Sequence, residues 1–309
     1  MSANDNDHGI DRKGLAAATA AYAFWGTVPL YWHLLKAVPS AQIIAHRIVW
    51  STVLVVGWLM FRDGLGWLRR VRMQPRAMVI LGLCGAVIAF NWGLYIWAVN
   101  AGHVVETSLG YFINPLISVL LGVMVLHERL HAIQWVAVGL AFIGVAWLTW
   151  SAGSPPWIAL GLAFSFGLYG LMRKIVAVEA VSGLGIESLY LFLPALAFVL
   201  WSENGHDGHF IGGWGWKNDL LLICSGAVSA VPLIAFAYGV RRITLSLAGL
   251  LQYIAPTLQL LLGVWFFHES FGRDRALGFA AIWAGLVLFA GANLWWMFKK
   301  RLTGLRARS

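Results

Sequence analysis

Charged side chains are scarce in this chain of 309 residues. Lysine, arginine, aspartate and glutamate together make up 11% of it, whereas hydrophobic residues make up 60%. A soluble domain carries roughly 25% charged residues and has no core large enough for so many apolar side chains. The composition therefore excludes an ordinary soluble protein and predicts a polytopic membrane protein.

Cysteine is also rare, and nucleotide-binding motifs are lacking. The two cysteines, Cys84 and Cys224, both fall within apolar runs, so we expect two small thiols inside helices rather than a disulfide. No Gly-x-x-x-x-Gly-Lys-Ser/Thr phosphate loop occurs, which argues against the use of ATP by this chain. We expect no cofactor and no bound metal.

Long apolar runs, each near the roughly 20 residues that a bilayer requires, recur along the whole chain. They are continuously apolar, which favours helices over the alternating strands of a membrane barrel. The sequence therefore predicts an all-α membrane protein with ten transmembrane helices. These lie at 14–35, 41–61, 77–98, 104–125, 132–150, 157–172, 184–201, 220–240, 245–267 and 276–298.

The net charge of +9 follows the predicted topology. With the N-terminus inside, 17 lysines and arginines fall on the cytoplasmic side and 4 on the opposite side. This bias is the positive-inside rule, and it argues against a nucleic-acid partner. We therefore expect a multi-pass protein of the bacterial inner membrane, in contact with the lipid bilayer. Its tails at 1–13 and 299–309 should both be cytoplasmic.

The two halves of the chain repeat each other at an offset of 141 residues. Residues 81–128 align without gaps on residues 222–269, and 15 of the 48 positions are identical. Unrelated apolar helices should share roughly one position in eight. Each copy holds five apolar runs, an odd number, so the second copy should cross the membrane in the opposite sense. Inverted repeats are typical of secondary transporters, whose site lies between the repeats near the midplane.

Two prolines mark that midplane. Pro115 and Pro256 each lie 11 residues into their runs, about 16 Å deep in a core about 30 Å thick. A proline inside a helix frees a carbonyl, which neighbours or a water-lined cavity must satisfy. We expect bends at both prolines and a substrate cavity beside them; two kinked packing helices are the alternative. The expected cavity residues here are Tyr111, Asn114, Gln252 and Tyr253.

Arg47 lies inside the second run, where a cation is costly and usually functional. We expect it to contact either an anionic group of the solute or Glu106, and both residues are assigned to the substrate site. The alternative is an arginine that snorkels to the outer interface.

Further candidates come from the first and third runs. Asn91 and Tyr95 share one helix face, and Trp25 lies one turn before Pro29. All but the proline are assigned to the substrate site. Aromatic residues near span ends also fit an interfacial belt.

The segment from His127 to His131 reads His-Glu-Arg-Leu-His and matches the zinc-protease pattern H-E-x-x-H. A membrane-embedded zinc metalloprotease using His127, Glu128 and His131 is therefore one alternative function. The repeat copy at 268–272 lacks the second histidine, and the pattern falls at a membrane edge. We expect no catalysis here, and expect the repeated His-Glu pair to cap and anchor a short connection within each half. A non-transporting membrane sensor or scaffold is the other alternative.

Several segments together resemble the RarD branch of the EamA-type carriers, in the drug/metabolite transporter superfamily. These segments are residues 24–32, 45–51, 91–100, 106–115 and 251–257. The resemblance implies two inverted five-helix EamA-like repeats, at 14–150 and 157–298, and alternating access. It also implies outward movement of small metabolites or amino acids.

The sequence as a whole predicts a secondary transporter and no enzyme. The expected cargo is a small polar or amphipathic organic solute, such as an amino acid, a metabolite or a drug. Amides, phenols and indoles suit a zwitterionic or aromatic solute. Its own gradient or protons would drive transport. The sequence does not indicate an oligomeric state.

Overall fold

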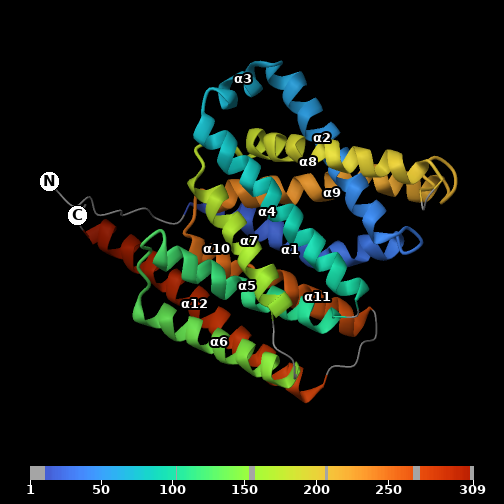
Figure 1. Cartoon of the computed structure of the whole chain (residues 1–309). Coiled ribbons are helices and arrows are strands. Elements are labelled where there is room, and N and C mark those ends of the chain that lie inside the picture. Colours follow the sequence, from blue (N-terminus) through green and yellow to red (C-terminus); the bar gives the residue numbers. More distant parts are fainter. Residues whose placement is uncertain (1–10, 102, 153–156, 206–207, 267–271, 307–309) are drawn as a thin grey trace.

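A computed structural model describes residues 11–101, 103–152, 157–205, 208–266 and 272–306. All regular secondary structure in these ranges is helical (Figure 1). The helices are α1 (Arg12–Leu34), α2 (Ser40–Asp63), α3 (Gly66–Arg72), α4 (Pro75–Asn100), α5 (Val104–Met124), α6 (Ala132–Ala152), α7 (Trp157–Ile175), α8 (Ala180–Glu203), α9 (Trp216–Val240), α10 (Leu245–Leu251), α11 (Ile254–Trp265) and α12 (Arg273–Arg306).

Each predicted apolar run corresponds to helix in the structure. One run, at 245–267, is divided into two helices, α10 and α11. The short helix α3 was not predicted. Among the described residues, seven stretches are long and apolar enough to cross a membrane. The apolar stretches in α5 and α12 are shorter than these seven. Helix α1 is not among the seven, because its hydropathy is lower. Alanine and glycine take the place of larger aliphatic residues in α1, which lowers its hydropathy.

The helices of the two halves pack in a repeating pattern. Helix α1 lies against α9 and α11, and its counterpart α7 lies against α4 and α5. Likewise α2 contacts α9, and α8 contacts α4. Counterparts also meet directly, as α2 with α8, α5 with α10, and α6 with α12. In Figure 1 the α6–α12 pair forms the lower edge, away from α2 and α8. These interfaces of one half thus have equivalents in the other.

Equivalent residues touch where α5 meets the α10–α11 junction. The Tyr253 hydroxyl donates to the Phe112 carbonyl at 3.1 Å, and these positions are 141 residues apart, the offset of the repeat. A Cβ added to Gly249 would lie 2.8 Å from the Pro115 carbonyl oxygen, so the two backbones need a glycine there to approach. The two halves therefore touch each other here through the equivalent residues Phe112 and Tyr253.

The two midplane prolines have different consequences. Helix α5 runs through Pro115, whereas the helical run around Pro256 breaks at Gln252 and Tyr253. At the break, Tyr253 N donates to the Leu250 carbonyl and Ala255 N to the Gln252 carbonyl. These tighter bonds satisfy the Gln252 carbonyl that Pro256 leaves without a helical donor. Only the second copy thus divides into two helices, and the bend at Pro115, within the continuous α5, stays a prediction.

Glu128 joins the two halves rather than capping a connection within its own half, which corrects our expectation for the His-Glu pair. Its carboxylate accepts from Leu245 N at 2.6 Å, from Ser246 N at 2.9 Å and from Ser246 Oγ at 2.7 Å. Lys174 Nζ lies 3.9 Å away. A carboxylate at the start of α10 takes up backbone donors that have no partner within the helix. The repeat copy, Glu269, lies outside the described residues.

Segments that carry most of the basic residues lie on one face of the molecule. Arg62 pairs with Glu179 at 2.9 Å, and Arg242 with Asp11 at 3.5 Å. These two pairs and the contacts of Glu128 lie at the start of α1 and in the segments that follow α2, α5, α7 and α9. The Arg62 guanidinium also lowers the pKa of the Glu179 carboxyl by hydrogen bonding to it.

A buried charge cluster lies between α7 and α8. Arg173 Nη1 is 3.0 Å from Glu187 Oε1, and both side chains are almost fully buried. The Tyr169 hydroxyl donates to Glu187 Oε2 at 3.1 Å, and Arg173 Nη2 donates to the Ala180 carbonyl at 3.0 Å. A Cβ on Gly183 would fall 2.1 Å from Arg173 Nη1, so this glycine makes room for the guanidinium.

Glu128→Ala should lower the free energy of unfolding by about 1–3 kcal/mol, because it leaves two N–H groups and one hydroxyl without their acceptor. Denaturant unfolding of the purified protein in detergent measures this change. His127→Ala is the matched control, since His127 is adjacent and exposed. Equal stability of the two variants would contradict the assignment.

Arg173→Met should destabilise the protein by about 3–5 kcal/mol, because Glu187 would keep a buried charge without its partner. The double variant Arg173→Met/Glu187→Leu removes both charges and should recover most of that loss. The same unfolding assay compares the three proteins. Additive losses in the double variant would show that the two charges do not stabilise each other.

Candidate substrate cavity

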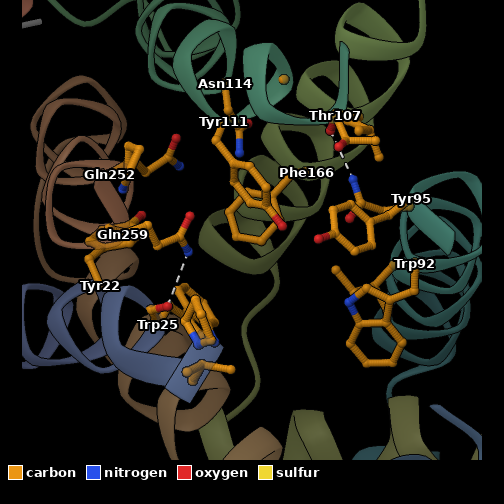
Figure 2. Close-up of a pocket in the computed structure, with 18 of the residues that line it drawn as sticks. Tyr22, Trp25, Trp92, Tyr95, Thr107, Tyr111, Asn114, Phe166, Gln252 and Gln259 are labelled. Atoms are coloured by element: carbon orange, nitrogen blue, oxygen red, sulfur yellow. Dashed lines mark hydrogen bonds between the residues drawn. The ribbon is translucent and has the colours of Figure 1, made fainter. Parts of the chain in front are cut away.

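A cavity of about 260 Å³ lies between helices of both halves. Its walls come from α1, α2, α4 and α5 of the first half and from α7, α9 and the α10–α11 region of the second. Rings and amides dominate the lining, as Figure 2 shows. The aromatic members are Tyr22, Trp25, Trp32, Trp92, Tyr95, Tyr111 and Phe166, and the polar members are Asn91, Thr107, Asn114, Gln252, Gln259 and Arg47.

Most of the residues assigned from sequence meet at this cavity. Seven line it: Trp25, Arg47, Asn91, Tyr95, Tyr111, Asn114 and Gln252. Tyr253 does not, because its side chain is buried and its hydroxyl is directed to the Phe112 carbonyl. The side chain of Glu106 lies outside those described. Of the two midplane prolines, Pro256 lines the cavity and Pro115 does not.

Arg47 enters the cavity from α2 and is held by contacts from three other helices. Its Nε donates to Ser229 Oγ at 3.0 Å. Its guanidinium carbon lies 4.2 Å from the centre of the Trp92 ring and 5.5 Å from that of Trp32, both within cation–π range. Among the side chains that the structure describes, no carboxylate pairs with it. This placement favours a role inside the protein over snorkelling to the outer interface.

Two amides hold the cavity wall together. Gln259 Nε2 donates to the Trp25 carbonyl at 3.3 Å, a bond drawn in Figure 2. That carbonyl has no helical donor because Pro29, four residues later, lacks an N–H. Asn91 Nδ2 donates to the Leu162 carbonyl at 2.9 Å and to Ser165 Oγ at 2.8 Å, which joins α4 to α7. The nitrogen of each amide is thus used structurally.

Asn114 presents a polar atom that the protein itself does not use. Its side chain is 8% exposed, and Oδ1 has no hydrogen-bond partner among the described residues. Figure 2 shows Asn114 above Tyr111, with Gln252 and Gln259 on one side and Tyr95 on the other. A buried acceptor without a partner is costly, so this oxygen is suited to a donor group on a bound solute.

Sequence reasoning missed several wall residues. Tyr22 and Trp32 lie on the same stripe of α1 as Trp25 and Pro29, at helical spacing. That aromatic stripe is a signal that the sequence contains and that would have found them. Phe166 in α7 packs its ring edge against Trp25, with ring centres 5.9 Å apart. Phe166 lies 141 residues after Trp25, the offset of the repeat, and this signal would have found it.

The zinc-protease alternative is not supported by the geometry. His127 and His131 are exposed and lie between α5 and α6, and His127 has a positive φ of 53°, so the pattern is not on a helix. The i,i+4 spacing brings two histidines to one metal only when they share a helix face. Glu128 is occupied by the start of α10. Within the described residues, no group of three metal-ligating side chains is placed to hold an ion.

Comparison with known proteins agrees with this architecture. The model of the EamA-like transporter family matches twice, at residues 12–150 and 155–291. Protein RarD of Streptomyces exfoliatus is 48% identical over 277 residues, covering 90% of this chain and 88% of the relative. Uncharacterized transporter YojE of Bacillus subtilis is 41% identical, covering 94% and 97%.

Two more distant proteins are also similar to this chain, one by sequence and one by its crystal structure. Chloramphenicol-sensitive protein RarD of Pseudomonas aeruginosa is 34% identical, covering 90% of this chain and 94% of that protein. A crystal structure with 22% identity superimposes with a TM-score of 0.68 over 89% of this chain and 96% of the other, which indicates a shared fold. With two family matches that together cover most of the chain, this protein belongs to the EamA-like transporter family, as a RarD-type multi-pass membrane protein of the drug/metabolite transporter superfamily.

Proposed function

We propose that this chain is a secondary transporter that exports a small polar or amphipathic organic solute across the bacterial inner membrane. The observation that carries the proposal is the cavity of about 260 Å³, lined by rings and amides from both halves. Its size is slightly below the about 300–1,000 Å³ of sites for drug-sized ligands, which suits a small metabolite.

Ten membrane spans in two inverted repeats form the proposed frame. The seven long apolar stretches, the shorter ones in α5 and α12, and α1 together supply ten crossings, with α10 and α11 acting as one broken span. The repeats would occupy residues 14–150 and 157–298. An odd number of spans in each repeat requires opposite orientations, and the equivalent interfaces of the two halves support this arrangement.

Alternating access follows from the position of the cavity between the halves. A rocking motion of one half against the other would expose the same wall residues first to one face and then to the other. The solute gradient or protons would supply the driving force. A sensor or scaffold of the same fold would have no need of solute flux, which separates that alternative experimentally.

Both termini are expected in the cytoplasm, because the basic segments lie on the face where α1 begins. In a background without Cys84 and Cys224, single cysteines at Ser2 and Ser309 should resist an impermeant thiol reagent added to intact cells. A cysteine at Lys217, in the first turn of α9 at the opposite end of the molecule, should react and serves as the control. Labelling at either terminus would refute this topology.

Loss of the cavity amides should weaken solute binding. Asn114→Ala and Gln252→Ala should each cost about 1–3 kcal/mol of binding free energy, because a polar group of the solute would lose its partner. A solute found by a thermal-shift screen of a metabolite library provides the ligand, and flux in proteoliposomes provides the activity. Thr149→Ala in α6 is the control, since Thr149 bonds only to its own helix, at the Val145 carbonyl. Wild-type affinity in both cavity variants would place the substrate site elsewhere.

A further inference from the structure

The cavity wall is positively charged. Among the 22 lining residues, all of which the structure describes, Arg47 alone carries a formal charge at neutral pH. The other polar groups are amides, a threonine hydroxyl, phenols and indoles. An arginine in a low-dielectric site without a counter-charge is costly, and a ligand that supplies the opposite charge recovers that cost.

The contacts of Arg47 leave part of its guanidinium free. Ser229 Oγ accepts from Nε at 3.0 Å, while the Trp92 and Trp32 rings flank the planar group. The two Nη nitrogens have no acceptor among the described residues. A guanidinium held in this way presents two parallel donors, the arrangement that matches the two oxygens of a carboxylate.

The remaining wall indicates what else the ligand carries. Trp25, Tyr95 and Phe166 offer ring faces and edges to an apolar body, and Asn114 Oδ1 is an acceptor without a partner. A free ammonium group would find no carboxylate among the lining residues, only rings and amide oxygens. A net negative solute therefore satisfies this wall better than a zwitterion or a cation does.

We infer that the cavity selects small organic anions, with a carboxylate bound by the Nη groups of Arg47 and an apolar or aromatic body held by the surrounding rings. This inference rests on the proposed transport function and specifies the chemical class of its substrate. Selection arises from charge and planar geometry together, so an isosteric amide, which has the shape without the charge, is the informative competitor.

Matched probes test the inference on the purified full-length protein. Three bodies are used, each as carboxylate, amide and amine: phenylacetate with phenylacetamide and phenethylamine, indole-3-acetate with indole-3-acetamide and tryptamine, and hexanoate with hexanamide and hexylamine. Thermal shift and calorimetry give the dissociation constants. For at least one body, the carboxylate should bind at least tenfold more tightly than its amide, and the amine more weakly than both. Equal binding of carboxylate and amide for every body, or binding of none, overturns the inference.

Variants then assign the effect to Arg47. Arg47→Gln should remove the preference for the carboxylate while changing the dissociation constant of the amide less than threefold. Arg47→Lys keeps the charge but loses the planar fork, and should fall between the two. Arg62→Gln, which removes an arginine paired with Glu179 at the face where α1 begins, should leave all constants unchanged. A carboxylate preference that survives in Arg47→Gln overturns the inference.

Two further measurements separate the possible failures. If Arg47→Gln does not fold, Ser229→Ala removes only the acceptor that orients Nε and should weaken carboxylate binding about threefold to tenfold; an unchanged constant counts against the inference. Flux of each probe in proteoliposomes distinguishes this inference from the proposed function. Transport of amides or amines in preference to carboxylates refutes the charge selection and leaves the transporter intact, whereas absence of flux for every solute refutes the transporter itself.

Discussion

The helices around the cavity are arranged so that backbone carbonyls that lose their helical donor to a proline find another donor inside the protein, since the bilayer core offers none. Pro29 deprives the Trp25 carbonyl of its helical donor, and Gln259 from the other half supplies one at 3.3 Å. Pro256 likewise leaves the Gln252 carbonyl without its helical donor. The helix breaks at this point, and Ala255 N donates to that carbonyl instead. Every such repair brings a polar side chain or an irregular turn to the centre of the molecule. Among the cavity amides, Gln259 has this role.

The same requirement joins the two halves. Described polar contacts between the halves include Glu128 with the start of α10, Tyr253 with the Phe112 carbonyl, Gln252 with Ser118, Gln259 with the Trp25 carbonyl and Arg47 with Ser229. Apolar side chains elsewhere in the interface face a solvent of similar polarity, so burial drives their association weakly. An interface that apolar burial holds only weakly fits the rocking motion proposed above.

Much of this architecture follows from the sequence, and particular residues show why the rest does not. Continuous apolar runs located the helices, and the 141-residue repeat identified the central prolines. Hydropathy does not depend on local backbone hydrogen bonds. It therefore did not distinguish the continuous helix α5 from the run that is broken into α10 and α11. Polarity at the midplane pointed to Tyr253, yet its hydroxyl is used by the Phe112 carbonyl across the interface. Phe166 was not predicted because an apolar wall residue resembles the other residues of its helix, and only the 141-residue offset, which pairs it with Trp25, marks it.

Two arginines inside the helix bundle, Arg173 and Arg47, have different surroundings and therefore different roles. Arg173 has Glu187 at 3.0 Å and a backbone carbonyl as partners, so its charge is balanced inside the protein and its role is structural. Arg47 has a serine and two indole rings, which orient the guanidinium but supply no negative charge. Burial of a cation is costly in both places, and only Arg173 is compensated by the described protein. The imbalance at Arg47 is sustainable because it faces a cavity, where the counter-charge can arrive with the solute and leave with it.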